Sequence, residues 1–159
     1  MSGRGVTSDR RDTPFAIQRR LEDEGLRTWI FGGWAEELRG LRNPGPHSDI
    51  DLLYPAGSFD LLDAVLVSAP ELEQITEKRF SHKRAFVAAG TMVEVFLLRP
   101  CGNRHVTHFW GQLALEWPEH ALGELDGARV ASVSALGFYR AEHARIDGVR
   151  KSLAASPSG

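Results

Sequence analysis

The sequence is poor in cysteine. Cys101 is the only cysteine among 159 residues, so no disulfide can form within the chain. A chain without disulfides fits a reducing compartment, and we therefore expect a cytoplasmic protein. Cys101 itself lies in Pro100-Cys101-Gly102-Asn103, which is typical of a turn after a strand and favours a structural position over a catalytic thiol.

Long apolar runs are missing as well. No stretch approaches the roughly 18 apolar residues that a membrane span needs. The segment from Met1 to Asp12 is polar and Arg-rich, without the apolar core of a secretory signal. We predict a disordered segment over residues 1–12, a single domain over residues 13–153 and a frayed tail over residues 154–159.

Neither sign of charge is in excess. The chain carries 19 basic and 21 acidic residues, for a net charge of −2. Proteins that bind nucleic acid independently of its sequence normally have a strongly basic surface. The balance of charge therefore argues against a polynucleotide substrate.

Helical and strand periods alternate through the first half of the chain. Asp12 or Thr13 can cap a first helix that ends at Gly25. The patterns of apolar, aromatic and β-branched residues then predict a strand over 28–31, a helix over 34–41, a strand over 49–54 and a helix over 58–67.

Shorter segments follow in the second half. The stretch from Leu72 to Leu98 is typical of three strands, with Gly90 at a hairpin turn between the last two. No element is assigned between Arg104 and Val130, although Trp117-Pro118 and Asp126-Gly127 are typical of turns. Ser132 or Ser134 can cap a final helix.

Two aspartates alternate with aliphatic residues in the predicted strand after residue 48. A period of two places Asp49 and Asp51 on one face and Ile50 and Leu52 on the other. Carboxylates in a strand interior are costly to bury unless something compensates them, and a divalent cation is a strong compensator. Asp49 and Asp51 are therefore candidate metal ligands, with a solvated strand face as the alternative.

Glu94 is the only charged residue in the apolar run from Met92 to Leu98. If its strand lies beside that of Asp49 and Asp51, three carboxylates converge, which is enough negative charge to hold Mg²⁺. The alternative is a charge on an edge strand that discourages aggregation.

The pair Gly32-Gly33 lies between a predicted strand and a predicted helix. Glycine lets the backbone approach a phosphate closely, and free N–H groups at a helix start favour an anion. Because this unit directly precedes Asp49, a phosphate-binding turn and a metal site can face one pocket.

These residues together resemble a known family. The run from Gly32 to Gly40, followed by Arg42 and His47-Ser48-Asp49-Ile50-Asp51-Leu52, resembles the nucleotidyltransferase superfamily of DNA polymerase beta type, and within it the small aminoglycoside and lincosamide nucleotidyltransferases. That signature is Gly-Ser or Gly-Gly, a helix, Asp-x-Asp and a third acid on a later strand. Gly33 departs from the commoner Gly-Ser form, and Glu94 stands where many relatives have Asp.

The resemblance implies an α/β (α+β) fold with a mixed central β-sheet flanked by helices and a C-terminal helix. It also implies an enzyme in which Asp49, Asp51 and Glu94 are catalytic and hold two Mg²⁺ ions. Such an enzyme moves a nucleoside monophosphate, by family habit AMP from ATP, to a hydroxyl of a small molecule such as an aminoglycoside or lincosamide antibiotic. Glu94 would be the general base, a metal ligand or both.

Six further residues are implied as nucleotide-binding: Gly32, Gly33, Arg42, His47, Lys83 and Arg84. The cations suit phosphate oxygens, but each is equally well a solvated surface charge. Four aromatic residues are expected either to line an acceptor pocket or to form the core: Trp34, Phe109, Trp110 and Trp117. Glu36, Glu37, Glu116 and Glu119 contact a cationic acceptor or simply face solvent.

Two other functions stay open. A nucleotidyltransferase fold without turnover would be a regulator or antitoxin-like binding module, and a protein-modifying form would transfer nucleotide to a Tyr or Ser of a partner. A chain this short offers little acceptor domain, so a homodimer that completes the pocket is a further expectation.

Overall fold

The computed structural model describes residues 2–155, with side chains from residue 10 onward. Its helices are α1 (Ser2–Asp23), α2 (Gly32–Leu38), α3 (Asp60–Ser68), the short 3₁₀ helix η1 (Thr76–Lys78) and α4 (Val133–Ala155). Its strands are β1 (Trp29–Phe31), β2 (Asp49–Pro55), β3 (Leu72–Gln74), β4 (Lys83–Ala88), β5 (Thr91–Cys101), β6 (Arg104–Phe109), β7 (Leu113–Glu116), β8 (Glu124–Leu125) and β9 (Ala128–Arg129).

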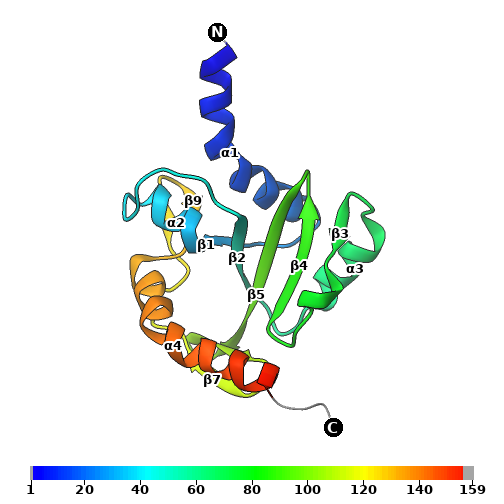
Figure 1. Cartoon of the computed structure of the whole chain (residues 1–159), viewed down its shortest axis with the longest axis vertical. Helices are drawn as coiled ribbons and strands as arrows, with labels where there is room; N and C mark the ends of the chain where they lie inside the picture. Colours follow the sequence, from blue (N-terminus) through cyan, green and yellow to red (C-terminus); the bar gives the residue numbers. More distant parts are fainter. Residues whose placement is uncertain (1, 156–159) are drawn as a thin grey trace.

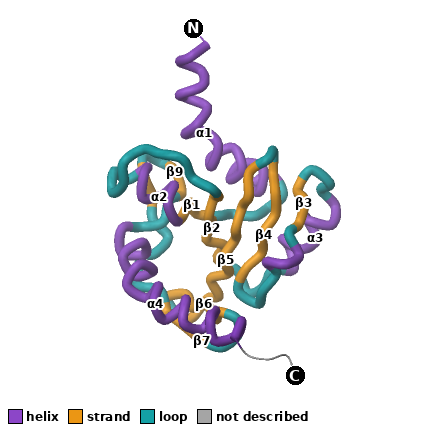
Figure 2. Tube along the Cα trace, viewed as in Figure 1, coloured by secondary structure: helices purple, strands orange, loops and turns teal. Residues whose placement is uncertain are grey.

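The centre of the molecule is a mixed sheet (Figures 1 and 2). Its strand order is β1-β2-β5-β4-β3, and β6 joins the far end of β5 and pairs with β7. Strands β2 and β5 are parallel, whereas β1 with β2, β4 with β5 and β3 with β4 are antiparallel. The expected α+β architecture with a mixed sheet and a C-terminal helix is confirmed.

The parallel pair β2–β5 lies in the middle of this sheet, and alternate residues on one of its faces are deeply buried. Ile50, Leu52, Val93 and Val95 are at most 1% exposed. Because side chains alternate along a strand, the residues between them point to the opposite face. The apolar positions thus fix the register that presents the acidic positions together.

Helix α2 packs on β1 and β2, while α3 packs on β3; Figure 1 shows them on opposite sides of the view, with α4 crossing below. The predicted cap of α4 is confirmed at Ser132, whose Oγ accepts the backbone N–H of Ala135 at 3.1 Å. Arg39, the residue directly after α2, donates to the carbonyl oxygen of Ala131 at 2.7 Å. This bond ties α2 to the segment that leads into α4.

Helix α1 begins at Ser2, well before the expected start at Asp12 or Thr13. Residues 2–12 are therefore helical where the sequence predicted disorder, and Met1 lies outside the described residues. Near the end of this stretch, the Arg10 guanidinium pairs with Glu37 of α2, a contact that local patterns do not reveal. Pro14 lies inside the helix, where it removes a backbone hydrogen bond, and Figure 1 shows α1 bending along its length. At the other end α4 extends to Ala155, and the rest of the predicted tail lies outside the described residues.

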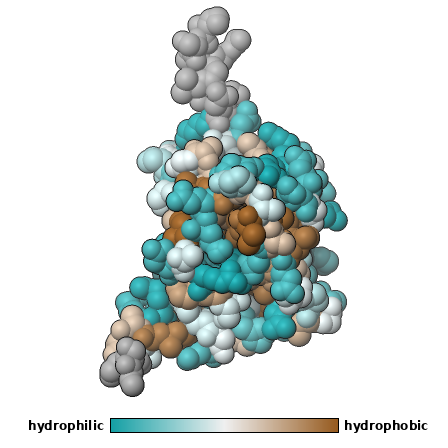
Figure 3. All heavy atoms as spheres, turned by 90° about the vertical axis from the view of Figure 1, so that its right-hand side faces the viewer, coloured by the Kyte–Doolittle hydropathy of each residue, from teal (hydrophilic) through white to brown (hydrophobic). Residues whose placement is uncertain are grey.

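The region that the sequence left unassigned forms β6, β7 and the small β8–β9 hairpin. The turn predicted at Asp126-Gly127 is confirmed, since both residues have positive φ angles, 50° and 83°. Among residues 2–155, no helix is both long and apolar enough to cross a membrane. The side that bears α3 and β3 is mainly hydrophilic, with apolar patches between polar side chains (Figure 3).

Candidate active site

Three carboxylates meet on the face of the β2–β5 pair opposite the apolar positions. Asp49 and Asp51 come from β2 and Glu94 from β5, and Asp51 lies directly across from Glu94 in the parallel register. One carboxylate oxygen from each lies within 4.8 Å of the other two. The predicted convergence therefore occurs, because the strand of Glu94 is the immediate neighbour of the Asp-Ile-Asp strand.

The ionised forms of Asp49 and Asp51 are unfavourable at this site. Burial, then the negative charge of Asp49 and of Glu94, raises the pKa of Asp51 well above its ordinary value. Burial and the charge of Glu94 also raise the pKa of Asp49. Both effects penalise an ionised carboxylate, and a cation would remove the penalty. Three hard oxygen donors around one point are the set that Mg²⁺ prefers, so these residues fit the ion.

Glu94 differs from its two neighbours because cations hold it ionised. Its Oε2 accepts from Nζ of Lys78 and from Nζ of Lys83, each at 3.2 Å. Burial by itself raises the pKa of Glu94, but Lys83 and Lys78 outweigh it and the net shift is downward. Lys83 was predicted for this region, whereas Lys78 was missed because η1, which carries it, has no sequence signal of its own.

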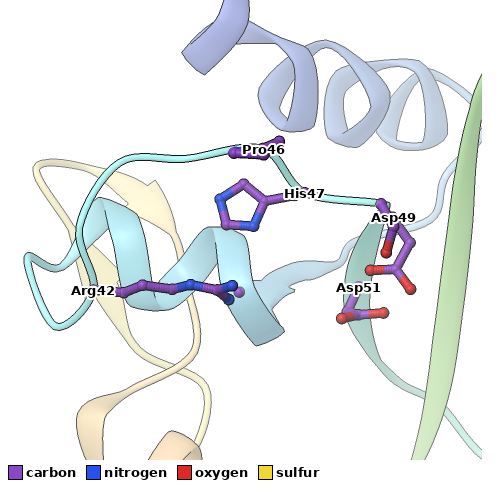
Figure 4. A pocket seen from close by; sticks show the side chains of 7 residues that line it. Arg42, Pro46, His47, Asp49 and Asp51 are labelled. Atoms are coloured by element: carbon purple, nitrogen blue, oxygen red, sulfur yellow. The ribbon is translucent and has the colours of Figure 1, made fainter.

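A pocket of about 600 Å³ opens beside the two aspartates. Figure 4 shows the Arg42 side chain running from the loop before β2 toward Asp49 and Asp51, with His47 above it. The pocket is lined by Gly33, Arg42, Pro46, His47, Ser48, Asp49 and Asp51. One cavity thus contains Gly33 and four other residues that were expected from the sequence, namely Arg42, His47, Asp49 and Asp51.

The glycine pair is required by what surrounds it. Gly32 has a φ of +65°, and a Cβ there would lie 2.2 Å from Oδ2 of Asp51. A Cβ on Gly33 would lie 2.6 Å from Nη1 of Arg42 and 2.8 Å from Nδ1 of His47. Gly32 therefore leaves room for the carboxylate of Asp51, and Gly33 leaves room for two side chains that face the same pocket.

Sequence reasoning missed the importance of Glu37. Its side chain is fully buried and binds both Arg10 guanidinium nitrogens at 2.7 Å, the backbone N–H of Gly45 at 3.2 Å and His47 Nε2 at 2.9 Å. The bonds from Arg10 hold the pKa of Glu37 far below its ordinary range despite burial. Glu37 thus joins α1, α2 and the loop before β2, and it fixes the His47 ring at the pocket wall.

Arg84 does not reach the pocket, which corrects the sequence prediction. It follows Lys83 on β4 and so points to the opposite face of the sheet. There its guanidinium donates to Asp63 of α3 at 2.7 and 3.1 Å and to the carbonyl oxygen of Phe80 at 2.7 Å. It is a structural cation that attaches α3 to the sheet.

The aromatic candidates divide between core and cavity. Trp34, Phe109 and Trp117 are buried at 7%, 1% and 0% exposure, while Trp110 is only partly buried. Phe109 and Trp110 also line a second cavity, next to Glu94. Four glutamates were considered as contacts for a cationic acceptor. Of these, Glu36 pairs with Arg140, and Glu37 is buried. Glu116 accepts a hydrogen bond from Cys101, and Glu119 accepts one from Asn103.

Comparison with known proteins shows what this architecture is similar to. The lincosamide antibiotic adenylyltransferase LnuA, in its lincomycin-bound crystal structure, superimposes with a TM-score of 0.64 at 12% identity, over 86% of this chain and 93% of that one. ANT(2″)-Ia, in complex with adenylyl-2″-tobramycin, superimposes with a TM-score of 0.58 at 18% identity, over 83% of this chain and 77% of that one. The chain has the nucleotidyltransferase fold.

The solved structures agree with the resemblance of the sequence motif to nucleotidyltransferases, although the overall sequence identity is low. No family model and no curated protein matches the chain. At such low identity the likeness concerns the fold, so the function of this nucleotidyltransferase fold has to be argued from its own residues.

Proposed function

We propose that this chain is a nucleotidyltransferase that moves a nucleoside monophosphate, with AMP from ATP as the expected case, to a hydroxyl group of a small molecule. The observation that carries the proposal is the cluster of Asp49, Asp51 and Glu94, which converges within 4.8 Å beside the Gly32-Gly33 turn. Buried like charges of this kind are costly and are typical of sites that use them.

Asp49 and Asp51 would hold Mg²⁺, with Glu94 completing the set. When bound, the ions would neutralise the triphosphate and polarise its α-phosphorus. Two Mg²⁺ ions are expected from the resemblance of the sequence to the family, and Asp49 and Asp51 together offer four carboxylate oxygens for them.

The triphosphate would lie in the 600 Å³ pocket. Arg42 and His47 face that space and would bind phosphate oxygens, while the Gly32-Gly33 backbone allows close approach. Lys83 would keep Glu94 ionised. Glu36 lies 3.8 Å from Nη1 of Arg42 and leaves that guanidinium half exposed, so Arg42 is free to turn toward a nucleotide.

The proposed reaction is an in-line displacement. The acceptor oxygen forms a bond to the α-phosphorus while the bond from that phosphorus to the bridging oxygen breaks, and pyrophosphate leaves with the electron pair. The hydroxyl proton passes to Glu94, whose pKa is lowered but whose position suits a proton acceptor, or to water if Glu94 serves as a metal ligand. Phosphoryl transfer of this kind depends mainly on positioning and charge neutralisation.

Finer points belong to the same proposal. An aminoglycoside or lincosamide acceptor and a role in antibiotic resistance are suggested by what LnuA and ANT(2″)-Ia bind. A cytoplasmic location and a homodimer in which a second copy covers the acceptor also remain proposals. The molar mass of the protein at micromolar concentration tests the homodimer.

The test is mass spectrometry of the protein incubated with Mg²⁺, each of the four ribonucleoside triphosphates and a panel of aminoglycosides and lincosamides. We expect a nucleoside-monophosphate adduct on one compound that disappears when Mg²⁺ is chelated. Asp49→Asn should lower the rate by at least about a hundredfold, because the ion loses a charged ligand.

Asp23→Asn is the matched control, since Asp23 is exposed at the end of α1 and far from the cluster in sequence. It should leave the rate unchanged. Full activity of Asp49→Asn would refute the site. Nucleotide binding without any adduct would instead favour the binding module, and an adduct on a protein side chain would favour the protein-modifying form.

A further inference from the structure

A second pocket opens on Glu94. It has a volume of about 140 Å³, and its lining shares no residue with the pocket of Asp49 and Asp51. Glu94 and Lys83 line it together with Tyr139 and His143 of α4. Glu94 therefore lines a cavity other than the one that Asp49 and Asp51 line.

Part of the wall of this second pocket is aromatic, and the rest includes charged side chains. The rings of His82, Phe109 and Trp110 pack together, with centroids 4.7 Å apart for His82 and Trp110 and 5.0 Å apart for His82 and Phe109. His82 Nδ1 accepts the backbone N–H of Trp110 at 3.0 Å. Burial lowers the pKa of His82 to about 4, so this ring is uncharged at neutral pH.

Trp110, one of the residues that line the pocket, lies in the turn between β6 and β7. Trp110 has a φ of +52°, in the left-handed region that bulky side chains seldom occupy. The hydrogen bond to His82 holds this conformation, and the turn thereby brings the Trp110 side chain to the cavity lined by Glu94. Gly111 follows with a φ of +71°, and the Gln112 N–H donates to the carbonyl oxygen of Phe109 at 2.9 Å, so Trp110 lies in a tight hairpin turn between β6 and β7.

The charges at the rim are already paired. Glu94 is bound by Lys78 and Lys83, and Asp147 is bound by Arg150 at 2.6 Å and Lys151 at 3.0 Å. These two acids are the only carboxylates among the described residues that line the pocket. A polycationic acceptor would find no unpaired carboxylate there, while an apolar ring would cover aromatic surface.

We propose that this pocket binds one ring of the acceptor, and that the acceptor is a neutral or singly charged molecule with a compact apolar ring next to its reacting hydroxyl, rather than a polycationic sugar. This inference rests on the proposed function, in which the acceptor is the molecule that receives the nucleoside monophosphate. A cavity of 140 Å³ is small beside typical ligand sites, so the rest of the molecule lies outside it.

The first test measures binding without turnover. Benzyl alcohol, a neutral ring with a hydroxyl group, and 2-deoxystreptamine, a diamine ring of similar size, are titrated separately into the protein while the indole N–H signals are followed by NMR. Benzyl alcohol should shift the Trp110 signal in a saturable way and leave the Trp29 signal in place, because Trp29 lies on β1 and bonds to Gly123. 2-Deoxystreptamine should shift neither signal.

Substituting Trp110→Leu should weaken the binding of benzyl alcohol by about tenfold, since one aromatic wall is lost. Binding is then followed through methyl signals, and unchanged signals elsewhere show that the variant folds. His143→Ala, an exposed change at the rim, is the second variant and should weaken binding less.

A shift of Trp110 by 2-deoxystreptamine and not by benzyl alcohol would overturn the proposal, and so would the absence of any shift. These readouts need neither nucleotide nor Mg²⁺. Failure of the proposed transfer reaction would therefore leave the binding result standing, and failure of the pocket would leave the transfer reaction to be judged by its adduct.

Discussion

At the scale of single residues, Asp51 bears the strongest electrostatic conflict of the site. It lies between Asp49 and Glu94, and its carboxylate occupies the space where Gly32 has no side chain. Its pKa is raised, so its ionised form costs stability in the folded protein and not in the unfolded chain. The cost is absent below the ordinary pKa of an aspartate and grows as the pH rises through the raised value.

Asp51→Asn should therefore stabilise the metal-free protein at neutral pH by roughly 1 kcal/mol, which is about 2–4 °C in Tm. This difference in stability should vanish near pH 4, where Asp51 of the native protein is protonated and carries no charge. Thermal unfolding at both pH values with a chelator present measures it.

Mg²⁺ with a nucleotide should make the native protein more stable than Asp51→Asn. The ligands should raise the Tm of the native protein more than that of Asp51→Asn, because the variant lacks one charged metal ligand. Asp23→Asn should behave as the native chain does throughout. A native protein more stable than Asp51→Asn in the chelator would show that the three carboxylates do not repel one another as the geometry indicates.

At the scale of elements, the site is built where the β1–α2 turn meets the loop before β2. Glu37 fastens that loop to α2 through Gly45 and His47, and Arg10 brings α1 onto the same carboxylate. Next to these contacts, neither Gly32 nor Gly33 has room for a Cβ, because neighbouring side chains fill the space. The turn, and not one catalytic side chain, therefore fixes where Asp51 and His47 lie.

Gly32→Ala should lower the rate of nucleotidyl transfer by at least a hundredfold, because its methyl group displaces the carboxylate of Asp51. Gly33→Ala should mainly raise KM for the nucleotide, since the end of the Arg42 side chain can move away. Gly40→Ala is the control: Gly40 has a similar φ of +74° but nothing within 4 Å of its Cβ position. It should lose about 1 kcal/mol of stability and keep its rate. Steady-state kinetics with urea unfolding separates these outcomes, and an active Gly32→Ala would contradict the account.

At the scale of the whole molecule, the alternation of Asp49, Ile50, Asp51 and Leu52 was enough to predict a shared acidic face, since strand period is local. The lone acid Glu94 in an apolar run indicated the neighbouring strand. Arg84 was misplaced because one residue of register decides which face of β4 a side chain occupies. The pairing of strands and the burial of Glu37 depend on contacts between distant segments, which no local pattern records.

The helical start of the chain was missed for a related reason. Within it, Arg10 contacts Glu37 of α2, a residue 27 positions away that the local sequence does not indicate. Lys78 was missed because its proximity to Glu94 arises only when η1 and β5 have come together. The sequence thus indicated the chemistry of the site, and the tertiary structure supplied its partners.

The central claim is that Asp49, Asp51 and Glu94 form a divalent-metal centre for nucleotide chemistry. The most direct measurement is anomalous diffraction from crystals grown with Mn²⁺, which accepts the same ligands as Mg²⁺, and a non-hydrolysable ATP analogue. We predict anomalous peaks within bonding distance of Asp49 and Asp51, with the triphosphate beside Arg42 and His47. A bound analogue with no metal at these carboxylates, or with metal held elsewhere, would contradict it.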